Sequence, residues 1–182
     1  MNTRSQDGFS YIDVMVAMVI LMIGILAMLS GLSASVVQAR SHEQQLLAKQ
    51  IATSIMESIM SVKETDTDTM GWSAVGNVGG NVDSNGVAHG IFVNGFQPAF
   101  TDPGPDEVLG TADDTGTAIG GVTRRVTITD LCDPDRPSYN CNPAGNRMVK
   151  FRSVTVSVKY FVGGLQRQED LTTILTDYQT SN

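Results

Sequence analysis

The chain has 182 residues, of which 41% are hydrophobic and 17% charged, and its formal net charge is −7. Residues 57–114 hold ten acids and one lysine, which argues against general nucleic-acid binding and leaves room for cations. Eighteen glycines and few aromatic residues indicate one modest, loop-rich domain with β structure, once the apolar N-terminal stretch is set aside.

The first predicted element is an apolar helix. Residues 14–29 contain no charged or strongly polar side chain. As a helix, residues 9–32 would extend roughly 36 Å, which is enough to cross a bilayer. An ordinary signal peptide fits poorly, because the only arginine near the N-terminus is offset by Asp7 and no small-x-small cleavage site follows the apolar run.

The helical pattern then continues as an amphipathic segment. Residues 38–63 contain neither proline nor glycine. Apolar residues three or four positions apart draw a stripe on one side of a soluble helix. We therefore predict one continuous helix of about 54 residues, roughly 80 Å long, with a membrane-spanning part over 9–37 and an amphipathic part over 38–64. The stripe consists of Leu47, Ile51, Ile55, Ile59 and Val62.

A short motif precedes the apolar helix. Gly8 is followed by Phe-Ser-Tyr-Ile-Asp, residues 9–13. This pattern resembles the processing site of type IV prepilins and type II secretion pseudopilins, where Gly, Phe, Thr or Ser, Leu, Ile or Val, and Glu introduce a long apolar helix. The chain has Tyr11 where Leu is usual and Asp13 where Glu is usual. The resemblance is specific over about residues 8–35.

The resemblance implies a defined maturation. Residues 1–8 would be a leader, and a prepilin peptidase would cut after Gly8 on the cytoplasmic face. Phe9 would become the N-terminal residue and would be methylated. The precursor would be a single-pass inner-membrane protein with a cytoplasmic N-terminus. The mature chain would join other pilin or pseudopilin subunits in a periplasmic or extracellular filament.

Asp13 has a physical role within that resemblance. A carboxylate inside a spanning helix costs on the order of 2.5–3.5 kcal/mol at mid-bilayer and less near the edge, so such acids are usually retained for a partner. In a filament, Asp13 could pair with the Phe9 amine of a neighbouring subunit and set the axial register. Otherwise Asp13 lies at headgroup depth. Ala17, Gly24 and Gly31 recur every seven residues, which suits close helix packing or is simply common in membrane helices.

Residues 65–182 are predicted to form an antiparallel β domain. Asn85-Gly86 and Asn94-Gly95 are hairpin signals, and Gly163-Gly164 suits a two-residue turn. Strands are predicted over 122–131, 153–162 and 165–175, with Trp72 anchoring the corner between helix and sheet. The fold class is therefore α+β, with the amphipathic helix on a small antiparallel sheet, which is also the pilin architecture. One face should be buried through Val122, Val126, Ile128, Val154, Val156, Val158, Tyr160, Val162, Leu171, Thr173 and Leu175.

The two cysteines suggest a covalent link. Cys132 and Cys141 lie in one short loop with prolines, which indicates a disulfide in an oxidising compartment, or two free thiols in a reducing one. A zinc site is disfavoured, because His42 and His89 are distant in sequence.

An acidic loop over residues 101–116 is a candidate calcium site. The loop holds Asp102, Asp106, Asp113 and Asp114 among three glycines and two prolines, and repeated carboxylates can supply the oxygen ligands that Ca²⁺ prefers. The spacing follows a calcium loop only in part, because Glu107 stands where the sharp-turn glycine belongs. The alternative is a solvated acidic loop.

The functional prediction is a non-catalytic subunit. The sequence contains no nucleophile elbow, no Walker loop and no H-E-x-x-H motif, so we do not expect an enzyme. We predict a minor pilin, most similar to minor pilins of the PilV type, that supports assembly of a type IV pilus. No cofactor is expected, and Ca²⁺ in the acidic loop is the one candidate. The alternatives are a minor pseudopilin of type II secretion, a membrane-anchored calcium-dependent surface protein, and an anchored enzyme.

Overall fold

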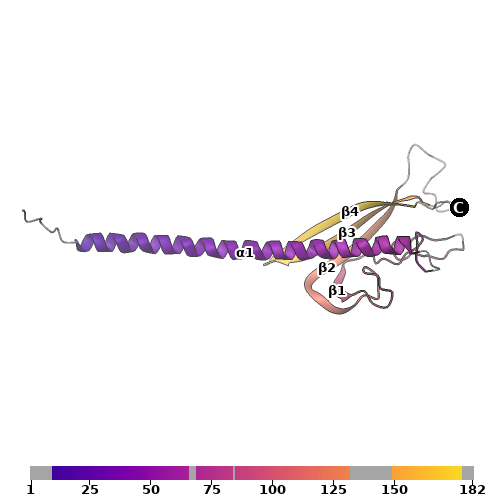
Figure 1. Ribbon diagram of the computed structural model, residues 1–182, viewed down its shortest axis with the longest axis horizontal. Helices are drawn as coiled ribbons and strands as arrows, with labels where there is room; N and C mark the ends of the chain where they lie inside the picture. The colour runs from indigo at the N-terminus through magenta and orange to yellow at the C-terminus, as the bar shows by residue number, and fades with distance from the viewer. Residues whose placement is uncertain (1–9, 66–68, 84, 132–148, 178–182) are drawn as a thin grey trace, which may run out of the picture. The chain divides into compact units, whose positions relative to one another are not determined.

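The structure is a computed structural model that describes residues 10–65, 69–83, 85–131 and 149–177 (Figure 1). It contains helix α1 (Tyr11–Glu64), followed by strands β1 (Gln97–Asp102), β2 (Thr115–Leu131), β3 (Phe151–Val162) and β4 (Leu165–Thr176). The chain divides into two compact units, residues 1–42 and residues 43–182. The predicted single helix of 54 residues is confirmed.

The first unit is the apolar part of α1. Residues 10–42 contain no proline. Hydrogen bonds within the helix satisfy its backbone N–H and C=O groups, so this largely apolar segment can remain helical. Within α1, an 18-residue window reaches a mean hydropathy of 2.7, and no residue of that window is buried. Among the described residues, this is the one helix long and apolar enough to span a membrane.

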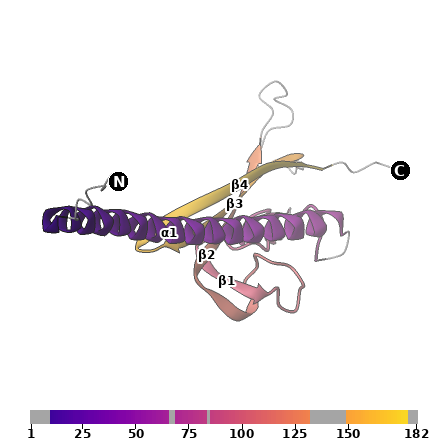
Figure 2. The same ribbon diagram turned by 60° about the vertical axis from the view of Figure 1, so that its left-hand side comes forward.

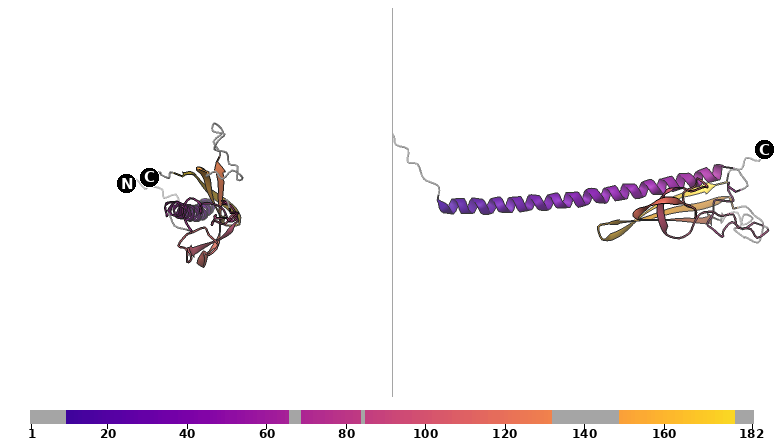
Figure 3. Two further views of the ribbon diagram at one scale, coloured as in Figure 1. Left: turned by 90° about the vertical axis from the view of Figure 1, so that its right-hand side faces the viewer. Right: turned by 90° about the horizontal axis from the view of Figure 1, so that it is seen from below.

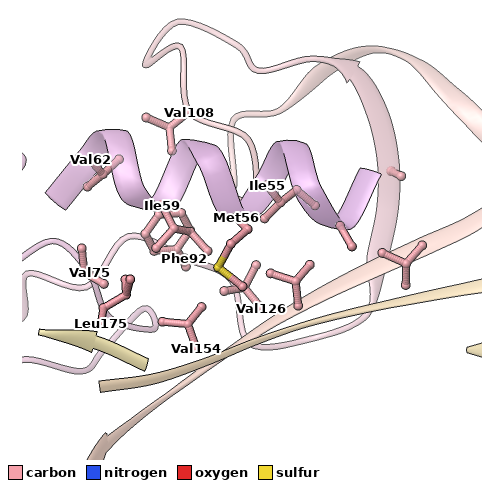
Figure 4. Close-up of a cluster of buried hydrophobic side chains, with 14 of the residues drawn as sticks. Ile55, Met56, Ile59, Val62, Val75, Phe92, Val108, Val126, Val154 and Leu175 are labelled. Atoms are coloured by element: carbon pink, nitrogen blue, oxygen red, sulfur yellow. The ribbon is translucent and has the colours of Figure 1, made fainter. Parts of the chain in front are cut away.

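The second unit is built on the amphipathic part of α1. Ile55, Ile59 and Val62 are at most 1% exposed, so the predicted stripe is confirmed over these residues. Leu47 and Ile51, at the N-terminal end of the stripe, are half-buried. Figure 4 shows Ile55, Met56 and Ile59 facing Phe92 and Val126 across the core. Helical spacing therefore places the apolar side chains against the β domain.

The sheet is an antiparallel meander in the order β1-β2-β3-β4, beside the C-terminal part of α1 (Figure 2). The three predicted strands fall inside β2, β3 and β4, and Gly163 begins the predicted turn with φ +61°. The inward row of β3 is buried as predicted: Val154, Val156 and Val158 have no exposed surface. In the turned views of Figure 3, the strands again run beside this part of the helix.

Three details differ from the predictions. Strand β1 was not predicted. It contains Pro98 and pairs with β2 through two register shifts, so the sequence shows no clear strand pattern there. The chain does turn tightly at Asn85-Gly86, between the bridged residues Val82 and Ala88, but Asn94-Gly95 leads into β1 and joins no two described strands. Leu171 on the edge strand β4 is 37% exposed, because the buried core extends to β4 only at Leu175.

Trp72 holds the corner after the helix, as predicted. Its indole Nε1 donates a hydrogen bond to the Val149 carbonyl oxygen over 2.6 Å. The Arg152 guanidinium lies 4.3 Å from the centre of the Trp72 ring and also donates to the carbonyl oxygens of Trp72 and Val75. The segment that follows α1 is thereby fastened to the start of β3.

Candidate functional site

The first turn of α1 contains the acid singled out by the motif. The Ser10 amide donates to Asp13 Oδ2 over 3.3 Å, and the Asp13 amide donates to the Ser10 carbonyl oxygen over 2.9 Å. Ser10 thus occupies the N-cap position, with Asp13 three residues later closing a contact like that of a capping box. An acid here also suits the positive end of the helix dipole. Asp13 therefore has a local role in starting the helix.

The surface that follows Asp13 is apolar on every side of the helix. Ile20, Met28 and Leu32 are 66%, 79% and 67% exposed, and the other large apolar residues from Val14 to Val37 are exposed as well. A Cβ atom added at Gly24 or Gly31 would meet nothing within 4 Å. Such a surface is stable only in lipid or against other apolar helices.

Two predicted features lie outside the described residues. Gly8 and Phe9, the proposed cleavage and methylation positions, precede the described part of α1. Cys132 and Cys141, the proposed disulfide, fall between β2 and β3 in residues 132–148. Both remain predictions from the sequence.

The acidic loop between β1 and β2 brings two of its carboxylates together. Thr111 Oγ1 donates to Asp113 Oδ1 over 2.6 Å, and Asp106 interacts with both Thr111 and Asp113. Burial raises the pKa of Asp106 above 3.8, whereas the hydrogen bond from Thr111 lowers the pKa of Asp113 below it. Glu107, at the position where a calcium loop has glycine, adopts φ +58°, the left-handed conformation that glycine favours.

The other two predicted ligands are engaged elsewhere. Asp102 Oδ1 accepts a hydrogen bond from the Gly104 amide over 2.9 Å. Asp114 forms an ion pair with Arg124, and both side chains are 2% exposed. Within the described ranges, no three His, Cys, Asp or Glu side chains are grouped closely enough to hold a metal ion. The loop therefore offers one carboxylate pair, Asp106 and Asp113, rather than the four-residue cluster.

Arg124 is a buried residue that the sequence analysis did not single out. Its Nη2 donates to the Thr111 carbonyl oxygen over 3.0 Å and to Asp114, whose carboxylate also accepts the Gly110 amide. The sequence could have indicated that Arg124 is buried, because strand alternation places it between Val122 and Val126 on the inward row of β2. An arginine in such a row needs a buried acid, and the acidic loop supplies it.

In comparisons with known proteins, no family model, no curated protein and no solved structure matches the chain.

Proposed function

We propose that this chain is a minor pilin, a subunit that supports assembly of a type IV pilus. In this proposal the precursor is inserted in the inner membrane, cut after Gly8 by a prepilin peptidase and methylated at Phe9. The observation that carries the proposal is the division of one continuous helix into an exposed apolar part and a part built into an α+β domain. A simple membrane anchor joined to a separate domain would not require one uninterrupted helix through both.

The motif and the helix support the proposal in complementary ways. Cleavage after Gly8 would remove only residues 1–8 and leave the apolar surface from Tyr11 onward attached to the domain. Packing of apolar helices in a filament core would cover that surface after it leaves the lipid. Asp13 would then exchange its contact with the Ser10 amide for the N-terminal amine of a neighbouring subunit. The role is assembly by non-covalent packing, not catalysis.

Intact-mass analysis of the mature chain tests the proposal. In cells that contain the prepilin peptidase, the mass should correspond to a chain that starts at Phe9 and carries one methyl group. In cells without the peptidase, and for Gly8→Trp, the uncut precursor should remain in the inner membrane. Normal cutting of Gly8→Trp, or cutting near Ala34 instead, would favour an ordinary anchor. A minor pseudopilin of type II secretion would mature identically, so assembly with pilus or secretion subunits separates those two roles.

The second candidate is a membrane-anchored, calcium-dependent surface protein. The adjacent carboxylates of Asp106 and Asp113 and the left-handed Glu107 favour it. Calorimetric titration of the full chain in detergent tests this candidate. We expect Ca²⁺ to bind the parent and to bind weakly or not at all when Asp106→Ala and Asp113→Ala are combined. An absence of heat in the parent at millimolar Ca²⁺ would end the calcium proposal and leave the pilin proposal untouched.

A further inference from the structure

The chain contains two Asn-Gly pairs, Asn85-Gly86 and Asn94-Gly95, and their surroundings differ. In such a pair the backbone nitrogen of the glycine can attack the asparagine side chain, because glycine has no Cβ atom to hinder the approach. Both asparagines are exposed to solvent. Exposure therefore does not distinguish the two pairs, and the state of each glycine nitrogen decides which pair can react.

The Asn85-Gly86 pair lies in a closed turn. The Gly86 amide donates a hydrogen bond to the Asp83 carbonyl oxygen over 3.1 Å. The Asp83 carboxylate accepts two more hydrogen bonds, from the Asn85 and Val87 amides, each over 2.8 Å. Attack by the Gly86 nitrogen requires this turn to open, so the turn protects the Asn85 side chain.

The Asn94-Gly95 pair is not held in this way. Among the residues that the structure describes, none accepts a hydrogen bond from the Gly95 amide. Within the same ranges, the Asn94 side chain makes one long hydrogen bond, in which Thr127 Oγ1 donates to Asn94 Oδ1 over 3.4 Å. A Cβ atom added at Gly95 would meet only Gln97 Nε2, at 3.9 Å. The Gly95 nitrogen is therefore free to approach the Asn94 side chain.

Two cations lie beside this second pair. The Arg125 guanidinium lies 4.6 Å, and Lys159 Nζ 3.8 Å, from the centre of the ring of Phe96, the residue that follows the pair. Thr127, which contacts the asparagine, lies two residues from Arg125 on the same face of β2. Within the described part of the chain, neither cation forms an ion pair. Their positive charge favours loss of the glycine amide proton and suits a carboxylate formed at the asparagine.

We propose that the structure selects Asn94 over Asn85 for spontaneous deamidation, and that Arg125 and Lys159 pair with the carboxylate that forms. The Gly95 nitrogen forms a bond to Cγ of Asn94, the bond from Cγ to Nδ2 breaks, and the side-chain nitrogen leaves as ammonia with the Gly95 amide proton. Water then opens the cyclic imide at either carbonyl carbon, which gives aspartate or isoaspartate without any change of oxidation state. The modification is independent of processing at Gly8 and adds one negative charge beside β2.

The test follows both asparagines in the full-length chain in lipid nanodiscs, incubated at neutral pH in water enriched in heavy oxygen. Chymotrypsin cuts after Phe92, between the two asparagines, so mass spectrometry measures heavy-oxygen incorporation at each site separately. Asn94 should deamidate about tenfold faster than Asn85, the factor expected if one hydrogen bond must first break in the closed turn. In urea that unfolds the domain, the two rates should become similar. Similar rates in the folded chain, or an unchanged ratio in urea, would overturn the proposal.

Matched variants test the two turns separately. Gly95→Ala should slow deamidation of Asn94 about tenfold, because a Cβ atom restricts the backbone that must bend toward the side chain, and should leave Asn85 unchanged. Asp83→Ala removes the carboxylate that closes the first turn, so it should speed deamidation of Asn85 and leave Asn94 unchanged. The unfolding transition in urea shows that each variant is folded. An Asn94 rate unaffected by Gly95→Ala would refute attack by the Gly95 nitrogen.

A second set of variants tests the role of the cations. Arg125→Gln combined with Lys159→Gln should slow deamidation of Asn94 about threefold, because the attacking nitrogen loses a nearby positive field. Asn94→Asp reproduces the aspartate product and should raise the urea midpoint at low salt but not at high salt, since salt screens exposed ion pairs. Asn85→Asp, beside the Asp83 carboxylate, should not raise the midpoint. An unchanged rate without the cations, or no salt-sensitive gain for Asn94→Asp, would refute their role.

Discussion

Residues 11–42 and 43–64 belong to one helix, but their apolar side chains have different surroundings. Ile20 and Leu26 in the first part are 66% and 56% exposed, whereas Ile55 and Ile59 in the second are at most 1% exposed. Helical geometry is common to both parts because neither contains proline. The distribution of apolar residues differs: a stripe can be covered by one sheet, whereas an apolar surface on all sides needs lipid or several helices.

The largest expected effect comes from a polar group that only the globular part contains. Asp114→Ala leaves Arg124 buried without its counter-ion, and should lower the free energy of unfolding by about 3–5 kcal/mol. Urea titration of the full chain in detergent, followed by fluorescence of the single tryptophan, Trp72, measures this change. Asp170→Ala, at an exposed position of β4, should change it by less than about 0.5 kcal/mol. Similar losses in the two variants would contradict the buried ion pair.

The second test compares isoleucines in the two parts of the helix. Ile59→Ala creates a cavity in the core and should lower the free energy of unfolding by about 2–5 kcal/mol. Ile23 is 62% exposed, so Ile23→Ala should change the same unfolding transition by less than about 0.5 kcal/mol. If both substitutions destabilised the domain equally, the apolar part of α1 would be packed within the chain, and the division of the helix would be wrong.

The third test asks which part of the helix needs an apolar environment. Leu26 and Leu46 are similarly exposed, at 56% and 58%. Leu26→Lys should make membrane insertion about 2.5–3.5 kcal/mol less favourable, because the charge lies in the middle of the apolar stretch. Leu46→Lys should have no such effect, because that position is on the polar side of the amphipathic part. Carbonate extraction of cell membranes measures the retained fraction, and equal retention would remove the basis for a spanning segment.

Periodicity accounts for most of what the sequence predicted correctly. The helix, its buried stripe and the strands β2, β3 and β4 all carry regular apolar spacing, and the structure contains them, although β2 begins seven residues before the predicted strand, at Thr115. Strand β1 has only one buried residue, Ala99, which lies between Pro98 and the half-buried Phe100, so no apolar alternation marks the strand. Leu171 was placed on the buried face by alternation alone, which does not reveal how far α1 extends across an edge strand.

The candidate sites were less predictable, because they depend on contacts distant in sequence. The acidic loop suggested four candidate ligands, but Asp114 forms an ion pair with Arg124 ten residues away on β2, a partner that spacing within the loop does not reveal. Cleavage at Gly8 and methylation of Phe9 depend on an enzyme outside the chain, so they remain predictions from the motif.

The smallest expected effect is a pH dependence confined to the globular part. Burial raises the pKa of Asp106 above 3.8, so the folded state binds this proton more tightly than the unfolded state. The stabilisation of the folded state by protonated Asp106 is fully present below pH 3.8 and is lost as the pH rises through the raised pKa. Compared with the parent, Asp106→Asn should therefore gain stability across this window, by less than about 1 kcal/mol because solvent screens the loop.

The pH dependence of stability that Asp113 causes should have the opposite sign to that of Asp106. Its pKa is lowered by the hydrogen bond from Thr111, so its contribution is present above pH 3.8 and is lost as the pH falls through the lowered pKa. Asp113→Asn should therefore be less stable than the parent at neutral pH, and the difference should shrink in acid. Urea titrations of both variants between pH 3 and 7, followed by Trp72 fluorescence, measure the slope of the unfolding free energy against pH for each variant relative to the parent. Slopes of the same sign would contradict the opposite pKa shifts of Asp106 and Asp113, and the arrangement of the two carboxylates in the loop would be wrong.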